Sequence, residues 1–270
     1  MKLAGKTVVV TGGGNGIGRE VVLELLRRGA KVAAIDLREE ALAATAELAG
    51  AGDRLATIAL DITDREAVDA LPARVAADLG PADGLVNVAG IIQPFVRIAD
   101  LDHDTIRRVI DVNLYGTLYT VKAFLPGFLE RPVAHVANVS SMGGFLPVPG
   151  QSVYGASKAA VRLLTEGLYA ELLDTRVAVT LILPGAVRTD ITGNSGVEAP
   201  GGAAAAEAAE RSRFPSTSPA EAGRIIVDGI ERDRLYVFVG KDARLMNVLT
   251  RIDPKRATQL ITRQMRDLLG

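Results

Sequence analysis

Short, continuous runs of apolar residues alternate along the chain with longer segments in which apolar positions recur every three or four residues. The short runs are rich in Val, Ile, Leu and Ala, which is typical of strands that are buried on both faces of a sheet. The longer segments have the period of amphipathic helices. We predict strands at residues 6–10, 31–36, 54–63, 84–90, 133–141, 176–185 and 234–240. We predict helices at residues 18–30, 38–50, 64–80, 104–130, 154–172 and from 218 onward.

Strands that alternate with helices predict an α/β fold, with a Rossmann-like doubly wound parallel sheet that is covered by helices on both faces. We expect one domain, residues 1–240, for dinucleotide binding and catalysis. Residues 191–217 are rich in Gly, Ala and Pro and are expected to form a substrate lid. Residues 241–270 have a helical pattern and are expected to form a C-terminal extension that packs on the body or on another subunit.

Two helix starts carry capping patterns. Thr63 with Glu66 predicts a capping box before the helix at 64–80. Ser218, Pro219 and Glu221 predict a capped start for the helix that follows the lid, with the proline in the first turn.

The composition excludes several kinds of function. The 270-residue chain is 48% hydrophobic and has a net charge of −1, which argues against nucleic acid as the main partner. It has no cysteine, so disulfides, thiolate nucleophiles and zinc–thiolate sites are excluded. His103 and His135 stand without a ligand-spaced carboxylate cluster, and we expect no metal.

The compartment is also predicted from the sequence. The first residues enter a strand directly and show no signal-peptide pattern. No uncharged run reaches the ~18 residues that a membrane span needs. We therefore expect a cytoplasmic protein without a membrane partner.

A glycine-rich turn follows the first strand and precedes the first helix. Its glycines are Gly12, Gly16 and Gly18, with Asn15 and Ile17 between them. Glycine permits a tight turn and a close approach of the backbone to a pyrophosphate, and the N-terminus of the helix attracts the anion. Glycine loops also occur as plain turns, but this position between strand and helix favours nucleotide binding.

Asp36 ends the second strand, where a carboxylate can accept the ribose hydroxyls and repel a 2′-phosphate. Its alternative role is to cap the next helix. Arg38 stands close to it, but no basic residue lies within the glycine loop, so NAD is favoured over NADP. Asp61 and Ile62 end the third strand, either beside an adenine or in a turn.

A serine, a tyrosine and a lysine follow one another in the segment after the fifth strand. Ser141 precedes Tyr154 by thirteen residues, and Lys158 follows Tyr154 by four. On a helix, residues i and i+4 share a face. An ammonium beside a phenol favours the phenolate, so we expect the pKa of Tyr154 to fall toward neutral pH. Tyr154 could then exchange a proton with a substrate oxygen.

Together these motifs resemble the short-chain dehydrogenase/reductase family, in its compact single-domain branch. The resemblance rests on TGGGNGIG, NVAG, the Asn of DVNLYG, the Ser–Tyr spacing, YGASK and LPG, and it extends from about Lys6 to Asp190. One departure is Val88, which stands where the family pattern NNAG has its second Asn.

The resemblance implies roles for individual residues. Tyr154 would be the general acid/base, Lys158 would tune it and hold the nicotinamide ribose, and Ser141 would polarise the substrate oxygen. Ser141 is preferred to Ser140 because it alone has the thirteen-residue spacing. Asn113 would hold a water that relays protons to the lysine. The implied cofactor-binding residues are Gly12, Asn15, Gly16, Ile17, Gly18, Asp36, Asp61, Ile62, Asn87, Ala89, Gly90, Tyr154, Lys158, Pro184, Gly185, Val187 and Thr189. Asn87 could instead brace a neighbouring strand.

The expected reaction is hydride transfer between NAD and a secondary alcohol or ketone. The expected pocket positions hold no charged residue that would bind a carboxylate or phosphate of the substrate. The candidate pocket walls are Gln93, Phe95, Gly143, Phe145 and Gln151, together with the lid and its Phe214.

Other functions stay open at this point. A 3-oxoacyl-thioester reductase would be expected to use NADP, which Asp36 disfavours. A nucleotide-sensing protein without catalysis would not need the four-residue set. The basic tail could lie on a membrane surface, although its apolar positions favour core or intersubunit packing. The family also implies a homodimer or homotetramer, formed through the helices around 104–130 and 152–173.

Overall fold

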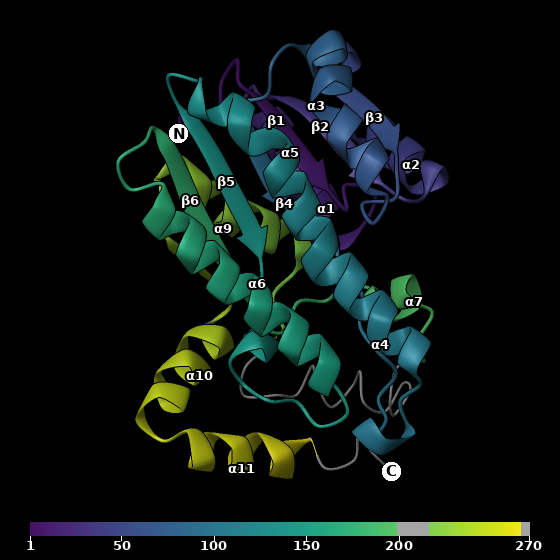
Figure 1. The fold of residues 1–270 in the computed structure, drawn as a ribbon, viewed down its shortest axis with the longest axis vertical. Coiled ribbons are helices and arrows are strands. Elements are labelled where there is room, and N and C mark those ends of the chain that lie inside the picture. The colour runs from purple at the N-terminus through teal and green to yellow at the C-terminus, as the bar shows by residue number, and fades with distance from the viewer. Residues whose placement is uncertain (199–215, 266–270) are drawn as a thin grey trace.

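The computed structural model describes residues 1–198 and 216–265. Its centre is a seven-stranded sheet in the order β3-β2-β1-β4-β5-β6-β7, and all neighbouring strands are parallel (Figure 1). The strands are β1 (Thr7–Thr11), β2 (Lys31–Asp36), β3 (Leu55–Ala59), β4 (Gly84–Asn87), β5 (Ala134–Val139), β6 (Val177–Pro184) and β7 (Tyr236–Val239). The predicted doubly wound α/β fold is confirmed.

Helices cover both faces of this sheet (Figure 1). The bounds of the α-helices are α1 (Gly16–Arg27), α2 (Glu39–Ala49), α3 (Arg65–Leu79), α4 (His103–Ile110), α5 (Thr117–Leu129), α6 (Ser152–Glu171), α7 (Ile191–Ser195), α9 (Pro219–Glu231), α10 (Lys241–Ile252) and α11 (Pro254–Gln264). Short 3₁₀ turns lie at η1 (Gly52–Arg54), η2 (Ile98–Asp100) and η4 (Met142–Gly144), and a π-helical segment, η3, lies at Asp111–Gly116.

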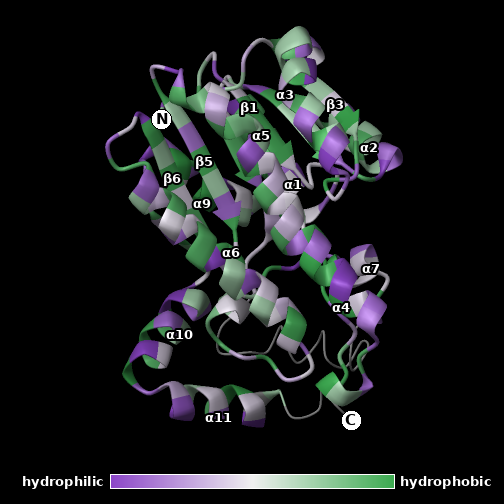
Figure 2. Cartoon of the chain, in the orientation of Figure 1, coloured by the Kyte–Doolittle hydropathy of each residue, from purple (hydrophilic) through white to green (hydrophobic). Residues whose placement is uncertain are grey.

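Alternate residues of the strands separate two hydrophobic cores. Val8 and Val10 of β1 face one way and pack with α1 and α9, whereas Val9 faces the other way and packs with α3, α5 and α6. Because both faces are covered, the strands are apolar throughout, which explains their continuous hydrophobic runs. Figure 2 shows this contrast between hydrophobic strands and helices with a hydrophilic outer side.

The strand order determines where a site can form. β1 pairs with β2 on one side and with β4 on the other. The strand order therefore extends in one direction from β1 to β3 and in the opposite direction from β4 to β7. The connections after β1 and β4 leave toward opposite faces and open a crevice at the carboxyl ends of the strands. The loops that follow β1, β2, β4, β5 and β6 all begin at this edge.

Two local predictions need correction. Asp64, and not Thr63, caps α3, because its carboxylate accepts the Ala67 amide at 3.1 Å. The hydroxyl of Thr63 is engaged with Asp61 at 2.8 Å. The helix predicted at 104–130 is divided by the π-helical segment η3 between α4 and α5.

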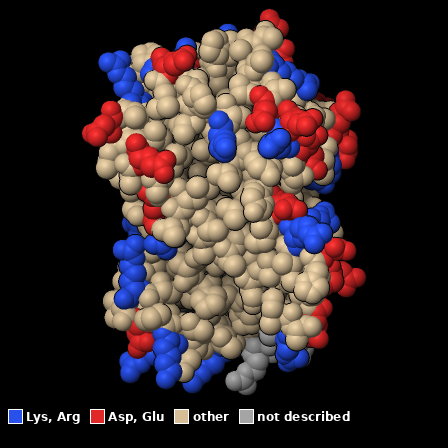
Figure 3. All heavy atoms as spheres, viewed as in Figure 1, with Lys and Arg blue, Asp and Glu red and all other residues tan. Residues whose placement is uncertain are grey.

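The end of the described chain agrees with the predicted helical pattern. Ser218 caps α9 through the Glu221 amide at 3.2 Å, with Pro219 in the first turn, as predicted. α10 and α11 follow β7 directly. None of the helices among the described residues is long and apolar enough to cross a membrane. On the face in front of the sheet, charged side chains lie mostly at the edges, and the centre over α5 and α6 is largely uncharged (Figure 3).

Candidate active site

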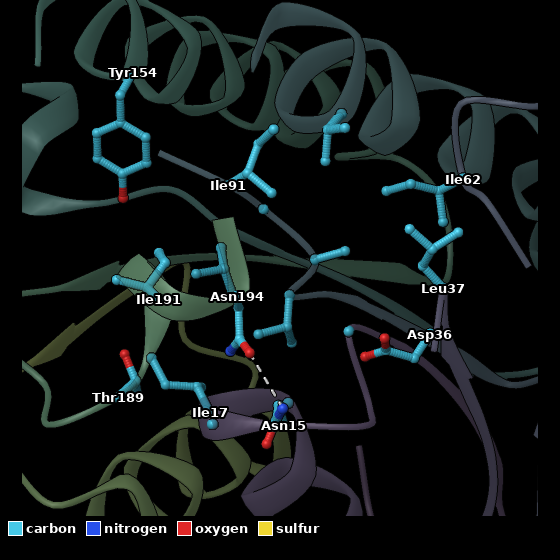
Figure 4. Close-up of a pocket in the computed structure, with 18 of the residues that line it drawn as sticks. Asn15, Ile17, Asp36, Leu37, Ile62, Ile91, Tyr154, Thr189, Ile191 and Asn194 are labelled. Atoms are coloured by element: carbon cyan, nitrogen blue, oxygen red, sulfur yellow. Dashed lines mark hydrogen bonds between the residues drawn. The ribbon is translucent and has the colours of Figure 1, made fainter. Parts of the chain in front are cut away.

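A cavity of about 570 Å³ lies at the carboxyl edge of the sheet. It begins beside Asp36 and ends at Ser141 and Tyr154, as Figure 4 shows for part of its lining. The predicted cofactor residues that line it are Gly12, Asn15, Gly16, Ile17, Gly18, Asp36, Asp61, Ile62, Ala89, Gly90, Tyr154, Lys158, Pro184, Gly185, Val187 and Thr189. One cavity therefore collects residues that the sequence distributes over nearly 180 positions.

The glycine-rich turn lies so close to its neighbours that side chains at Gly12 and Gly18 would not fit. Gly12 has a φ of +69°, and a Cβ there would lie 2.9 Å from backbone atoms of Ala89. A Cβ at Gly18 would overlap the carbonyl of Gly12. The turn thus packs directly against the β4 loop, and the first residues of α1, Gly16, Ile17 and Gly18, line the cavity.

Two backbone hydrogen bonds hold the carboxylate of Asp36 at the cavity wall. It accepts the Gly14 amide at 3.0 Å and the Arg38 amide at 3.1 Å. Arg38 occupies the N-cap position of α2 and makes no side-chain capping hydrogen bond. Asp36 therefore does not have the N-cap position that the sequence left open for it. A fixed carboxylate at the end of the second strand is suited to accept hydrogen bonds from the hydroxyls of a ribose.

Asn194 of α7 was not predicted from the sequence, although it lines the cavity. Its side-chain oxygen accepts hydrogen bonds from Asn15 at 3.3 Å and from the guanidinium of Arg38 at 2.8 Å (Figure 4). Ser195, next to it, accepts the Ile92 amide at 3.0 Å. The first residues of the predicted lid, which include α7, therefore bridge the two walls. Residues 199–215, Phe214 among them, lie outside the described part of the chain.

Ser141 and Tyr154 meet at the inner end of the cavity. Both side chains line the cavity, and the Ser141 hydroxyl accepts the Gly143 amide at 3.0 Å. Ser140 is buried, and its hydroxyl donates to the carbonyl of Lys158 at 2.7 Å. The structure therefore supports Ser141 as the serine of the site and gives Ser140 a structural contact.

The ammonium of Lys158 is buried behind Tyr154. It donates to the Val139 carbonyl at 3.1 Å and lies against Gly90, where a Cβ would be 3.0 Å from Nζ. Burial disfavours the charged form, so the pKa of Lys158 falls from 10.5 to about 8. Near neutral pH the side chain is still mostly protonated.

The expected fall in the pKa of Tyr154 is contradicted by the structure of the protein alone. Burial raises the pKa of the phenol, and the hydrogen bond with Ser141 opposes this rise only in part. The four-residue spacing places Lys158 on the same face of the helix, but burial is the largest influence on the phenol. The tyrosine thus keeps its proton at neutral pH.

Asn113 lies in η3 and is completely buried. Its amide accepts from the Ile91 backbone and donates to the Ile91 carbonyl and to Ser157, each at 2.9 Å. It therefore clamps the loop after β4 onto α6, one residue before Lys158. The π-helical segment explains how an Asn inside a long helix can turn toward the active site.

Gln93 and Gln151, which we expected to form the substrate pocket, are buried and do not line the cavity. Gln93 accepts the amides of Val153 and Tyr154 at 2.8 and 3.0 Å, so it caps α6 from a distant loop. Gln151 donates to the Gln93 carbonyl at 2.7 Å. This pair holds the first turn of the helix that carries Tyr154.

The remaining candidates divide in a similar way. Gly143 lies against Tyr154 and Ser141, since a Cβ there would be 3.3 Å from the ring of Tyr154 and 3.4 Å from the Ser141 hydroxyl. Phe145 packs in a separate apolar cluster with Leu146, and the half-buried Phe95 does not line the cavity. Asn87 is buried among polar side chains and bonds to Asn138 at 2.9 Å, which is the bracing role left open by the sequence.

Asp242, at the start of α10, was also missed. Its carboxylate accepts the Ala186 amide at 2.7 Å and occupies the space that a Cβ on Gly185 would need. It thereby holds the loop after β6, which contributes Pro184, Gly185 and Val187 to the cavity. Residues so far apart in sequence gave no local signal of this contact.

The sequence model of the short chain dehydrogenase family matches residues 6–199. The chain belongs to this family. The match includes the glycine-rich turn, Asp36, Asn113, Ser141, Tyr154 and Lys158.

Individual relatives of this short-chain dehydrogenase agree with the assignment. A Mycobacterium tuberculosis protein named as an oxidoreductase, SadH, is 38% identical over 252 residues, which are 92% of this chain and 91% of that one. The 3beta-hydroxysteroid dehydrogenase 2 of Eggerthella lenta is 38% identical over 191 residues, which are 70% of this chain and 74% of that one.

Solved structures are similar in fold as well. A short-chain dehydrogenase/reductase from Burkholderia phymatum in complex with NAD aligns with a TM-score of 0.81 at 26% identity, over 93% of this chain and 96% of that one. One from Burkholderia cenocepacia in complex with NADP aligns with a TM-score of 0.78 at 27% identity, over 98% and 99%. The neighbours thus include complexes with either dinucleotide.

The buried ammonium of Lys158 predicts a pH-dependent stability. The unfolded chain keeps this proton up to pH 10.5, whereas the native dehydrogenase loses it near pH 8. Between these values the unfolded state binds more protons, so stability rises with pH. Relative to Lys158→Met, the free energy of unfolding of the wild type should increase by roughly 2 kcal/mol from about pH 7.5 to about pH 9.5. Urea titrations without added nucleotide measure this difference, and parallel curves for the two proteins would contradict it.

The Gln93 cap predicts a linked loss of stability and turnover. Gln93→Met keeps the shape but leaves the amides of Val153 and Tyr154 without their acceptor. We expect the free energy of unfolding to fall by about 1–3 kcal/mol and kcat to fall with it. Gln93→Glu restores an acceptor and should recover part of kcat. Unchanged kcat in a folded Gln93→Met protein would show that the cap does not position Tyr154.

Proposed function

We propose that this short-chain dehydrogenase is an NAD-dependent alcohol dehydrogenase/ketone reductase, which transfers a hydride between the nicotinamide and a secondary alcohol or ketone. The observation that carries the proposal is the juxtaposition of Ser141 and Tyr154 at one end of a cavity whose other end holds the fixed carboxylate of Asp36. A proton-transfer group and a ribose acceptor are thereby arranged along one dinucleotide-sized space.

The residues present fit a dinucleotide. The glycine turn leaves backbone amides open at the N-terminus of α1, in a place where a Cβ at Gly12 or Gly18 would not fit. Such a turn is suited to bind a pyrophosphate. Lys158 and the loop of Pro184–Gly185 line the far end of the cavity and would hold the nicotinamide riboside.

The protein residues supply orientation and proton transfer, and the nicotinamide supplies the hydride chemistry. Ser141 donates a hydrogen bond to the substrate oxygen and orients it beside Tyr154. Tyr154, which retains its proton at neutral pH, gives that proton to a ketone oxygen during reduction, and its deprotonated form accepts it during alcohol oxidation. General acid–base catalysis of this kind contributes about 10²–10⁴ in rate.

The roles of the neighbouring residues follow from their contacts. Lys158 places a positive charge behind the phenol and stabilises the phenolate once it forms. Asn113 keeps the Ile91 loop and Ser157 in place, so the lysine is presented from a fixed helix. We propose that this clamp completes the proton route that the family resemblance implies.

Two observations support NAD over NADP. Asp36 is held in the cavity as a carboxylate acceptor and would repel a 2′-phosphate. The guanidinium of Arg38 is bonded to Asn194 at 2.8 Å and is therefore engaged by a protein acceptor. The proposal of an NADP-dependent thioester reductase is weaker for the same reasons.

An apolar substrate is supported by the surroundings of the catalytic pair. The apolar side chains of Ile91, Val187 and Ile191 line the cavity. A relative named as a hydroxysteroid dehydrogenase is consistent with such a substrate class. The juxtaposition of Ser141 and Tyr154 disfavours a role in nucleotide sensing alone.

Assembly and location stay predictions. The uncharged centre of the face over α5 and α6 supports a homodimer or homotetramer (Figure 3). Leu163 of α6 is 71% exposed. Cytoplasmic location rests on the sequence pattern alone.

Tyr154→Phe removes the proton donor and keeps the ring. We expect turnover of secondary alcohols and ketones to fall by at least about 10²-fold, with NAD binding largely retained. A panel of both substrate types, followed by the absorbance of the reduced cofactor, measures the first effect, and calorimetry measures the second. Tyr169→Phe, on the same helix, is the matched control. Substantial activity of Tyr154→Phe would refute the assignment.

Asp36→Asn removes the charge and keeps the shape. We expect the ratio of kcat/KM for NAD to that for NADP to fall at least about tenfold, because a 2′-phosphate is no longer repelled. Glu39→Gln, an exposed neighbour that does not line the cavity, is the control and should leave the ratio unchanged. Better turnover with NADP by the wild type would overturn the cofactor proposal.

A further inference from the structure

α10 and α11 form a corner at the carboxyl side of the sheet, which is the side of the active site (Figure 1). They are anchored by an apolar cluster in which Met246, Ala257 and Ile261 pack on Leu146, with Met142 and Phe145 beside them. Leu249 and Met265 also pack against this cluster. Other apolar residues of α10 and α11 do not belong to it within the described chain.

The unpartnered apolar residues of this corner are strongly exposed. Ile252, at the end of α10, has 76% of its surface exposed, more than any other large apolar residue of the described chain. Val248 and Leu260 are 48% and 49% exposed, and Leu245 is 38% exposed. Of the two arrangements that the sequence favours, core or intersubunit packing, the first therefore does not account for them.

Helical geometry places three of them in one stripe. At 100° per residue, Leu245, Val248 and Ile252 lie within a sector of about 60° on α10, opposite the buried Met246. Arg244 and Arg251 lie along one edge of this stripe. An apolar stripe with arginines at its border is typical of a helix that lies at a lipid–water interface.

Positive charge dominates the exposed surface of the same corner, along the lower left and lower edges in Figure 3. We call this surface the basic corner. Its exposed residues are Lys241, Arg244, Leu245, Val248, Arg251, Ile252, Lys255, Arg256, Leu260 and Arg263. The two acidic residues of this segment, Asp242 in the first turn of α10 and Asp253 directly after it, are engaged by groups of the protein. Asp242 accepts the Ala186 amide, and Asp253 caps α11 through the Arg256 amide and pairs with the Arg256 side chain.

We propose that the basic corner binds peripherally to the surface of an anionic lipid bilayer, with Ile252 and Val248 inserted between the headgroups. The six cations would lie against lipid phosphates, where each basic residue strengthens binding about fivefold. A second copy of the chain fits less well, because a symmetric contact would bring the same cations against one another. Bound in this way, the carboxyl edge of the sheet would face the membrane.

Vesicle co-sedimentation with the full-length protein tests this proposal. The probes are phosphatidylglycerol vesicles and phosphatidylcholine vesicles at low salt. We expect binding to the first and little to the second, with release at roughly 0.5 M salt. The triple substitution R251Q/K255Q/R256Q should weaken the affinity on the order of 100-fold. Ile252→Asp should weaken it at least about tenfold.

Matched controls separate the corner from general effects. Leu48→Asp removes a residue of α2 that is 63% exposed, and it should bind vesicles like the wild type. Thermal melting and turnover of a soluble substrate verify that every variant is folded and active, and sedimentation velocity reports the oligomeric state. The proposal is overturned by absent binding to phosphatidylglycerol, by equal binding to both vesicles, or by triple-variant binding equal to that of the wild type. It is also overturned if Ile252→Asp dissociates subunits while vesicle binding persists.

Discussion

The parallel alignment of all seven strands is the constraint on which the rest of this molecule depends. It brings the ends of β1, β2, β4, β5 and β6 to one edge, and the reversal between β1 and β4 opens the crevice there. At its narrowest point the backbone of Gly12 meets that of Ala89, a contact that leaves no room for a side chain. The glycine-rich turn, Asp36 and Tyr154 line one cavity only because of this alignment.

Burial decides the protonation of the catalytic pair. Without solvent, Tyr154 holds its proton more tightly and Lys158 holds its proton less tightly than in water, so the two pKa values move apart. Tyr154 therefore keeps its proton near neutral pH, as a proton donor to a substrate oxygen must. The helical spacing of the two residues makes them neighbours, and the surrounding core determines how strongly each binds its proton.

Contacts from distant segments hold the catalytic elements in position. Gln93 supplies the cap that α6 lacks locally, Asp242 fixes the loop after β6, and Asn194 joins the glycine turn to Arg38. Each is a polar side chain that bonds to a group far away in sequence. Such residues carry no motif of their own, which is why Gln93 resembled a pocket wall and why the other two went unnoticed.

The sequence by itself determined the order of strands and helices, the fold class, the glycine turn, Asp36 and the Ser141–Tyr154–Lys158 set, because these follow from periodicity and short spacings. Only the tertiary structure decided that Asp64 caps α3, that a π-helical segment turns Asn113 inward, and that burial raises the pKa of Tyr154. It also divided the apolar residues of α10 and α11 between a packed and an exposed face. The physical reason is the same throughout: local spacing fixes which residues share a face, whereas solvent exclusion and long-range hydrogen bonds depend on what packs against that face.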